Sequence, residues 1–136
     1  MNYKRLSFLL LLLLPGLCYS IGKEWPFINK CNQIQSLAYE LHDYRDHKKQ
    51  LSFCRFQSIH MINDINAVCS ALHEDRLAYA KTMTGVSINR IDLLKGAGCR
   101  SKNKITELEQ ELTHLLNLID SIICLKHKKR FKKIFH

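Results

Sequence analysis

The feature that most constrains this chain is its set of cysteines. Six occur in the 136 residues, and one of them, Cys18, lies in an apolar N-terminal leader. The other five lie within or next to segments with a helical pattern: Cys31, Cys54, Cys69, Cys99 and Cys124. Disulfide bridges between helix ends are a common way for a small secreted protein to compensate for a small core. The cysteines therefore favour an extracellular signalling or binding module over a cytosolic enzyme.

Residues 1–20 have the pattern of a secretory signal peptide. Lys4 and Arg5 give a positive start, residues 6–17 form an apolar run, and Cys18-Tyr-Ser20 places small residues at the positions expected before a cleavage site. The alternative is a membrane anchor, but the apolar run is short for a span of the bilayer. The sequence therefore predicts a soluble, secreted mature chain that begins near Ile21.

Residues 21–136 have the length of one domain, and their apolar residues recur at helical spacing. Four segments are predicted to be helical: 31–47, an apolar stripe from Ile62 to Ala80, a short segment 87–95 after a break at 82–85, and a long segment from about 103 to 123. One buried stripe on each helix predicts an all-α fold, a short-chain four-helix bundle.

The predicted connections indicate a topology. Residues 47–61 and 96–103 are both long for turns between antiparallel neighbours, and two long connections are typical of the up-up-down-down order. In that order the start of the first helix and the end of the last lie at the same end of the bundle. Cys31 and Cys124 would then be close enough for a disulfide bridge.

Four short strings of the sequence resemble the cysteine landmarks of the interleukin-4/interleukin-13 group of short-chain helical cytokines. They are NKCNQIQSL at 29–37, FCR at 53–55, VCSAL at 68–72 and LLKGAGC at 93–99. The basic, aromatic end LKHKKRFKKIF at 125–135 is similar in character to the end of interleukin-13. The resemblance implies a disulfide-stapled bundle of the up-up-down-down type.

The resemblance also implies disulfide pairings. The bridge from the second helix to the last long loop corresponds to Cys69 with Cys99, and the bridge from the first helix to the last corresponds to Cys31 with Cys124. Cys54 matches a loop cysteine whose usual partner is missing in this chain. It is therefore a free thiol, an interchain bridge that makes a dimer of an otherwise monomeric protein, or a sign of other pairings.

The function implied by the resemblance is that of a secreted cytokine. Such a protein binds and pairs type I cytokine receptor chains and triggers intracellular kinase signalling in type 2 immune regulation. By the same resemblance Glu40 is the candidate acid on the first helix, and Arg90 is the candidate basic anchor. Tyr44 either flanks this receptor-binding site or belongs to the core. The alternative for the two charged residues is an ordinary solvated helix surface.

The C-terminal residues 126–136 form a basic tail. Six cations lie there, and they account for most of the net charge of +7 that remains without the leader. The candidates for binding a polyanion are Lys128, Lys129, Arg130, Lys132 and Lys133. The tail binds a sulfated glycosaminoglycan or an anionic membrane, extends the fourth helix toward a second receptor chain, or is a solubilising terminus.

Other classes of function have little support in the sequence. His73-Glu is not followed by the second histidine of a metalloprotease motif, and neither a nucleophile elbow nor a phosphate-binding glycine loop occurs. We therefore expect no enzyme activity, no metal, no cofactor and no binding of nucleic acid. The alternative to the cytokine is a secreted cationic host-defence or toxin peptide that acts on anionic membranes through the tail.

Overall fold

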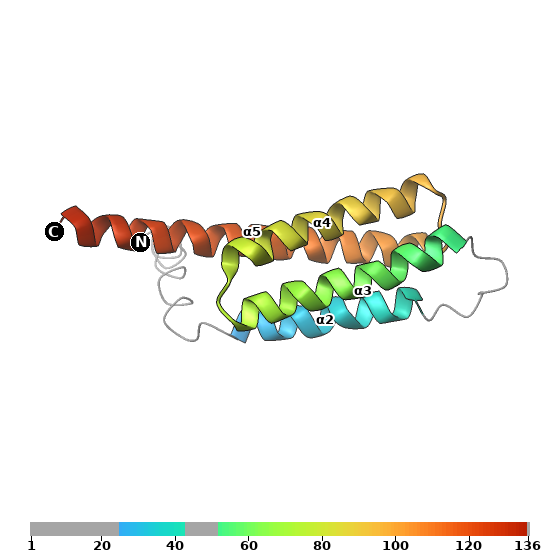
Figure 1. Cartoon of the computed structure of the whole chain (residues 1–136), viewed down its shortest axis with the longest axis horizontal. Coiled ribbons are helices and arrows are strands. Elements are labelled where there is room, and N and C mark those ends of the chain that lie inside the picture. The colour runs from blue at the N-terminus through green and yellow to red at the C-terminus, as the bar shows by residue number, and fades with distance from the viewer. Residues whose placement is uncertain (1–24, 43–51, 136) are drawn as a thin grey trace, which may run out of the picture.

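The computed structural model describes residues 25–42 and 52–135, which form four helices and no strand. The helices lie side by side in a bundle (Figure 1). Their bounds are α2 (Trp25–His42), α3 (Ser52–His73), α4 (Leu77–Gly96) and α5 (Lys102–Phe135). The prediction of an all-α, disulfide-stapled four-helix bundle is confirmed.

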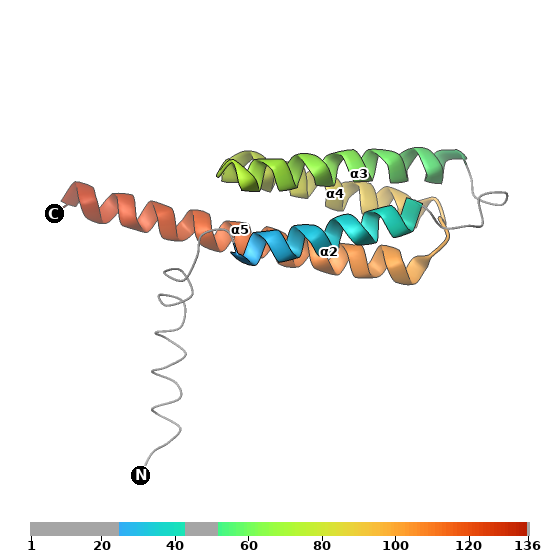
Figure 2. The same ribbon diagram turned by 90° about the horizontal axis from the view of Figure 1, so that it is seen from below.

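The order of the helices differs from the prediction. Each helix runs antiparallel to the one before it, so the topology is up-down-up-down (Figures 1 and 2). Each helix packs against two neighbours: α2 contacts α3 and α5, and α4 contacts the same two helices. The up-up-down-down prediction is wrong because the connections 74–76 and 97–101 are short turns, and neither can carry the chain along the length of the bundle.

Helix α3 begins at Ser52, about ten residues before the start that the apolar stripe predicts. Two polar side chains, Gln57 and Ser58, occupy buried positions in its first turns, which hid the helical stripe in the sequence. Both are hydrogen-bonded: the Ser58 hydroxyl donates to the Arg55 carbonyl at 2.8 Å, and Gln57 accepts from Arg90 at 2.5 Å. Burial of a polar group costs little when its hydrogen bonds are made.

Helix α4 passes through residues 82–85, where the sequence predicts a break. Thr84 and Ser87 are fully buried in the bundle. Each hydroxyl donates to the carbonyl one turn earlier, Thr84 to Ala80 at 2.7 Å and Ser87 to Met83 at 3.0 Å. Because the helix backbone accepts these hydrogen bonds, the hydroxyls are satisfied inside the core and the helix continues.

The short turns begin with helix C-caps of one type. Asp75 (φ 59°) and Gly98 (φ 67°) both have left-handed backbones just beyond α3 and α4. In each case the backbone amide of the following residue donates to a carbonyl in the last helical turn. Arg76 donates to Ala71 at 2.8 Å, and Cys99 donates to Leu94 at 3.1 Å. This is the Schellman pattern, which ends a helix and reverses the chain at once.

Two disulfides connect the first three helices. Cys31 of α2 is bonded to Cys69 of α3, and Cys54 of α3 is bonded to Cys99, which follows α4; both pairs have a Cα–Cα distance of 5.7 Å. Cys124 is exposed and carries a free thiol. The expected pairs Cys31–Cys124 and Cys69–Cys99, and an unpaired Cys54, are therefore wrong. The antiparallel order of α2, α3 and α4 explains the observed pairs, because it brings their ends together.

Helix α5 is much longer than its neighbours. Its 34 residues span about 50 Å, whereas α3, with 22 residues, spans about 33 Å. Its core-facing residues are fully buried as far as Ile119, and none of residues 120–134 is buried. The C-terminal part of α5 extends beyond the ends of the other helices as a single helix (Figures 1 and 2).

Candidate functional site

Arg90 lies in the seam between α3 and α4. Its Nε donates to the Asp64 carboxylate at 2.8 Å, and its Nη1 donates to the Gln57 side-chain oxygen at 2.5 Å. The side chains of Arg90 and Asp64 are only 19% and 14% exposed. In the free protein the guanidinium therefore holds the two helices together and has a fixed orientation.

Glu40 lies at the C-terminal end of α2 and contacts α5. Its carboxylate accepts a hydrogen bond from Lys104 Nζ at 2.5 Å, and a second, longer one from the Ser36 hydroxyl at 3.4 Å. The hydrogen bond and the positive charge of Lys104 lower the pKa of Glu40. Both partners are substantially exposed to solvent, so this pair is part of the surface.

The structure does not bring the receptor-binding candidates together. Glu40 lies in the seam of α2 with α5, whereas Arg90 lies in the seam of α4 with α3. These seams are on opposite sides of the bundle, because α2 and α4 do not contact each other. Tyr44, the third candidate, lies outside the described residues. A single site that combines Glu40 with Arg90 is therefore not compatible with this arrangement.

Large apolar side chains are exposed on the side of the bundle where Arg90 lies. On α3, the Phe56 ring packs edge-on against His60, with 4.2 Å between ring centroids, and remains 57% exposed. We call this group, together with Arg90, the α3–α4 face; its apolar residues are Phe53 and Phe56 on α3 and Val86 and Leu93 on α4. The exposed fractions of Phe53, Val86 and Leu93 are 43%, 38% and 52%.

Helical spacing places Phe53, Val86 and Leu93 on the rows that include Arg90 and its partner Gln57, and Phe56 packs on His60, four residues before Asp64. Phe53 precedes Gln57 by four residues, so it shares the α3 row that accepts the guanidinium of Arg90. Val86 precedes Arg90 by four residues and Leu93 follows it by three, so all three lie on one row of α4. The sequence analysis missed this face. Its signal in the sequence is apolar residues that lie off the buried stripes of the two helices.

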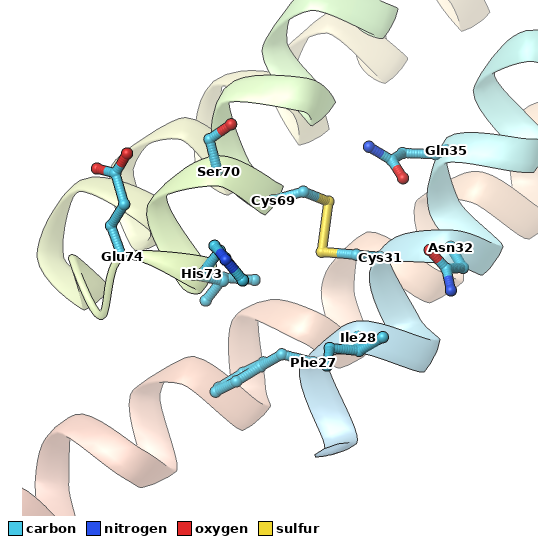
Figure 3. A pocket seen from close by; sticks show the side chains of 10 residues that line it. Phe27, Ile28, Cys31, Asn32, Gln35, Cys69, Ser70, His73 and Glu74 are labelled. Carbon is cyan, nitrogen blue, oxygen red and sulfur yellow. A yellow bond between two sulfur atoms is a disulfide. The ribbon is translucent and has the colours of Figure 1, made fainter. Parts of the chain in front are cut away.

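A cleft of about 340 Å³ lies beside the Cys31–Cys69 disulfide (Figure 3). Figure 3 shows the disulfide between the two helices that form the cleft, with Phe27 and Ile28 on α2, Ser70 and His73 on α3, and Glu74 in the turn that follows α3. No group of three or more potential metal ligands occurs here or elsewhere in residues 25–42 and 52–135.

A second cleft lies where α5 leaves the bundle. It measures about 450 Å³ and is formed by the turn after α3, the first turn of α4 and the side of α5 that faces them. Its charged and aromatic lining residues are Asp75, Arg76, Tyr79, Lys126, His127 and Arg130. The Arg76 guanidinium lies 4.8 Å from the centre of the Tyr79 ring, and it is also 3.4 Å from Glu74.

Residues 124–135 of α5, which we call the basic arm, continue from this cleft. All five polyanion candidates lie on the arm and are exposed: Lys128, Lys129, Arg130, Lys132 and Lys133. Phe131 and Ile134 are 64% and 77% exposed on the same segment. Cys124, at the start of the arm, carries the free thiol. Of the three alternatives for the tail, only the helical part of one, an extension of the last helix, is visible in this geometry.

None of the helices that the structure describes has the length and apolar character needed to cross a membrane. Comparison with known protein families, with curated proteins and with solved structures finds no match to this chain.

Proposed function

We propose that the protein is a secreted, cytokine-like ligand that binds the ectodomains of type I cytokine receptors. The observation that carries the proposal is the α3–α4 face, where the exposed side chains of Phe53, Phe56, Val86 and Leu93 lie on the two helices that an ordered Arg90 joins. Disulfides in a small helical bundle support a role outside the cell, because such bonds persist in oxidising compartments.

The composition of this face suits a protein interface. Aromatic residues and arginine are the types most enriched among residues that dominate binding energy, and apolar neighbours around them exclude water. Asp64 and Gln57 hold Arg90 in place before a partner arrives. Binding then loses little side-chain entropy at this residue, which favours affinity.

A receptor-pairing ligand needs two separate surfaces, and the bundle offers them. The α3–α4 face lies on one side, and the exposed Glu40–Lys104 pair lies in the seam of α2 and α5 on the opposite side. Two receptor chains can therefore bind without overlap. The up-down-up-down order differs from that of the cytokines that the sequence resembles, so the proposal rests on these surfaces and not on the topology.

The test is binding of the oxidised chain, residues 21–136, to ectodomains of the interleukin-4 and interleukin-13 receptors by surface plasmon resonance. Phe56→Ser and Leu93→Ser should each weaken binding by about 1–2 kcal/mol if they contact a receptor. Ile28→Ser is the matched control, because Ile28 is similarly exposed, at 46%, but lies on α2.

The second surface is tested with Glu40→Ala in the same assay. We expect it to weaken binding of one receptor chain, while Phe56→Ser and Leu93→Ser weaken binding of the other. Circular dichroism should confirm that every variant remains folded. If the wild-type chain binds none of the ectodomains, or if Ile28→Ser weakens binding as much as Phe56→Ser, the proposal is wrong.

A further inference from the structure

The cleft at the base of α5 and the basic arm form one continuous cationic surface. Three of the cleft's lining residues, Arg76, Lys126 and Arg130, are cationic. Two carboxylates lie against them, Glu74 on Arg76 and Asp75 on Lys126, so the cleft keeps a net positive charge. Beyond the cleft the described arm contains only cations among its charged residues. We propose that this surface binds a sulfated polysaccharide chain, which enters the cleft and continues along the arm.

The positions of the cations match an extended polyanion. Lys126, Arg130 and Lys133 are spaced four and three residues apart, so they form one row along α5, about 10 Å long. Arg76 faces this row from the other wall of the cleft. Sulfate groups repeated along a polysaccharide can contact successive members of the row, and guanidinium groups can bind their oxygens in pairs.

Contacts within the protein fix the orientation of two of the cleft's cations. Lys126 Nζ lies 2.8 Å from each carboxylate oxygen of Asp75, which positions the base of the arm against the turn between α3 and α4. The guanidinium of Arg76 packs over the Tyr79 ring. Arg76 can therefore bind a sulfate with little further ordering, and Arg130 lies exposed on the α5 side of the same cleft.

The shape of the surface favours a chain over a membrane. A bilayer surface is flat, and it cannot contact both walls of a concave cleft at once. Lys128 and Lys132, four residues apart, also form a second row on another side of the arm, so positive charge extends around much of the helix. A flexible chain can follow this distribution, whereas a membrane-bound helix places its cations on one face opposite an apolar one.

The test is calorimetric titration of the oxidised chain, residues 21–136, with a size-defined heparin octasaccharide at two salt concentrations. Two double variants probe the surface: Arg76→Gln with Arg130→Gln in the cleft, and Lys132→Gln with Lys133→Gln on the arm. Each should weaken binding about tenfold and make it less dependent on salt, because fewer counterions are released.

The control is the double variant Arg55→Gln with Lys102→Gln. It removes the same charge from exposed residues at the opposite end of the bundle, where α3 and α5 begin. We expect its affinity to equal that of the wild type. If the wild type does not bind, if the control loses as much affinity as the other variants, or if unsulfated hyaluronan binds equally well, the proposal is wrong.

Titration with vesicles that contain phosphatidylserine tests whether the negatively charged partner is a membrane instead of a polysaccharide. Under the proposal they bind more weakly than the octasaccharide, and Ile134→Ser leaves octasaccharide binding unchanged. If the vesicles bind more tightly and Ile134→Ser abolishes that binding, the partner is a membrane and the proposal is overturned. These outcomes do not depend on the receptor assay, because the variants used there lie outside the cleft and the arm.

Discussion

Lys126 on α5 and Asp75 in the turn between α3 and α4 form a two-pronged ion pair, with 2.8 Å from Nζ to each carboxylate oxygen. Asp75 has the left-handed backbone that ends α3, so the same residue reverses the chain and binds α5. The contact lies just past Ile119, the last buried residue of α5. It therefore marks the boundary between the bundle and the basic arm.

Deletion of residues 127–136 should leave the bundle stable. Residues 127–134 of this segment are all exposed, so we expect the free energy of unfolding to change by less than about 0.5 kcal/mol. Urea unfolding followed by circular dichroism measures this change. A loss of more than about 2 kcal/mol would show that the arm supports the fold.

The disulfide pattern predicts which peptides remain linked after digestion. Mass spectrometry without reduction should find Cys31 linked to Cys69 and Cys54 linked to Cys99, while Cys124 reacts with maleimide in the native protein. The double variant Cys54→Ala with Cys99→Ala should lose about 3–4 kcal/mol of stability. Cys124→Ser should lose almost none, because its side chain is exposed. A Cys31–Cys124 peptide would contradict this pattern.

Arg90 should contribute to stability as well as to binding. Arg90→Ala leaves the partly buried Asp64 carboxylate and the Gln57 amide without their partner, and we expect a loss of about 1.5–3 kcal/mol in urea unfolding. Lys81→Ala is the control, because its ion pair with Asp120 is about half exposed and should contribute less than about 0.5 kcal/mol. Equal losses would contradict the buried role of Arg90.

Two glycine substitutions should change stability in opposite directions. An added Cβ meets no atom within 4 Å at either Gly85 or Gly98, so backbone conformation decides the result. Gly85→Ala in the middle of α4 should stabilise the protein by about 0.5–1 kcal/mol. Gly98→Ala should destabilise it by about 1 kcal/mol, because its φ is 67°. Thermal unfolding of the two variants tests both signs.

Glu40 should titrate below the ordinary range for glutamate. Lys104 lowers the pKa of Glu40 in the folded protein, so their pair stabilises the fold at neutral pH. That contribution is lost as the pH falls below 4.5 and through the lowered pKa. Carbon-detected NMR titration of the Glu40 carboxyl should give this low midpoint, and Lys104→Met should raise it. An unchanged midpoint in Lys104→Met would contradict the assignment of the cause.

Helical periodicity was sufficient to predict the all-helical fold and most of the core. The long segment predicted from about 103 to 123 lies within α5, and its apolar stripe is buried at Ile105, Leu108, Leu112, Leu115 and Ile119 and partly buried at Ile122. Helical periodicity failed where buried polar residues interrupt a stripe. Gln57 and Ser58 hid the first turns of α3, and Thr84 with Gly85 gave a false break in α4. These polar side chains find their hydrogen-bond partners on another helix or on their own helix backbone. A pattern of apolar residues in the sequence cannot predict such partners.

The topology and the disulfides could not be derived once those helix ends were misplaced. With α3 starting late and α4 starting at Ser87, both connections looked long enough to cross the bundle. The candidate sites failed for a related reason. Arg90 and Glu40 were chosen by resemblance, and the structure places them on opposite sides, whereas Phe56 and Leu93 became visible as candidates only through their exposure.

The two disulfides cross-link three of the four helices and leave α5 without a disulfide to the others. Both bridges involve α3, one near each of its ends, so α2, α3 and α4 form a single covalent network. Among the described residues, no disulfide joins α5 to that network, so packing, hydrogen bonds and ion pairs such as Lys126–Asp75 hold it in place. A separation of α5 and its arm from the other three helices would break these non-covalent contacts but neither disulfide. An opened state of this kind would expose the leucines of α5 and the groove that they fill.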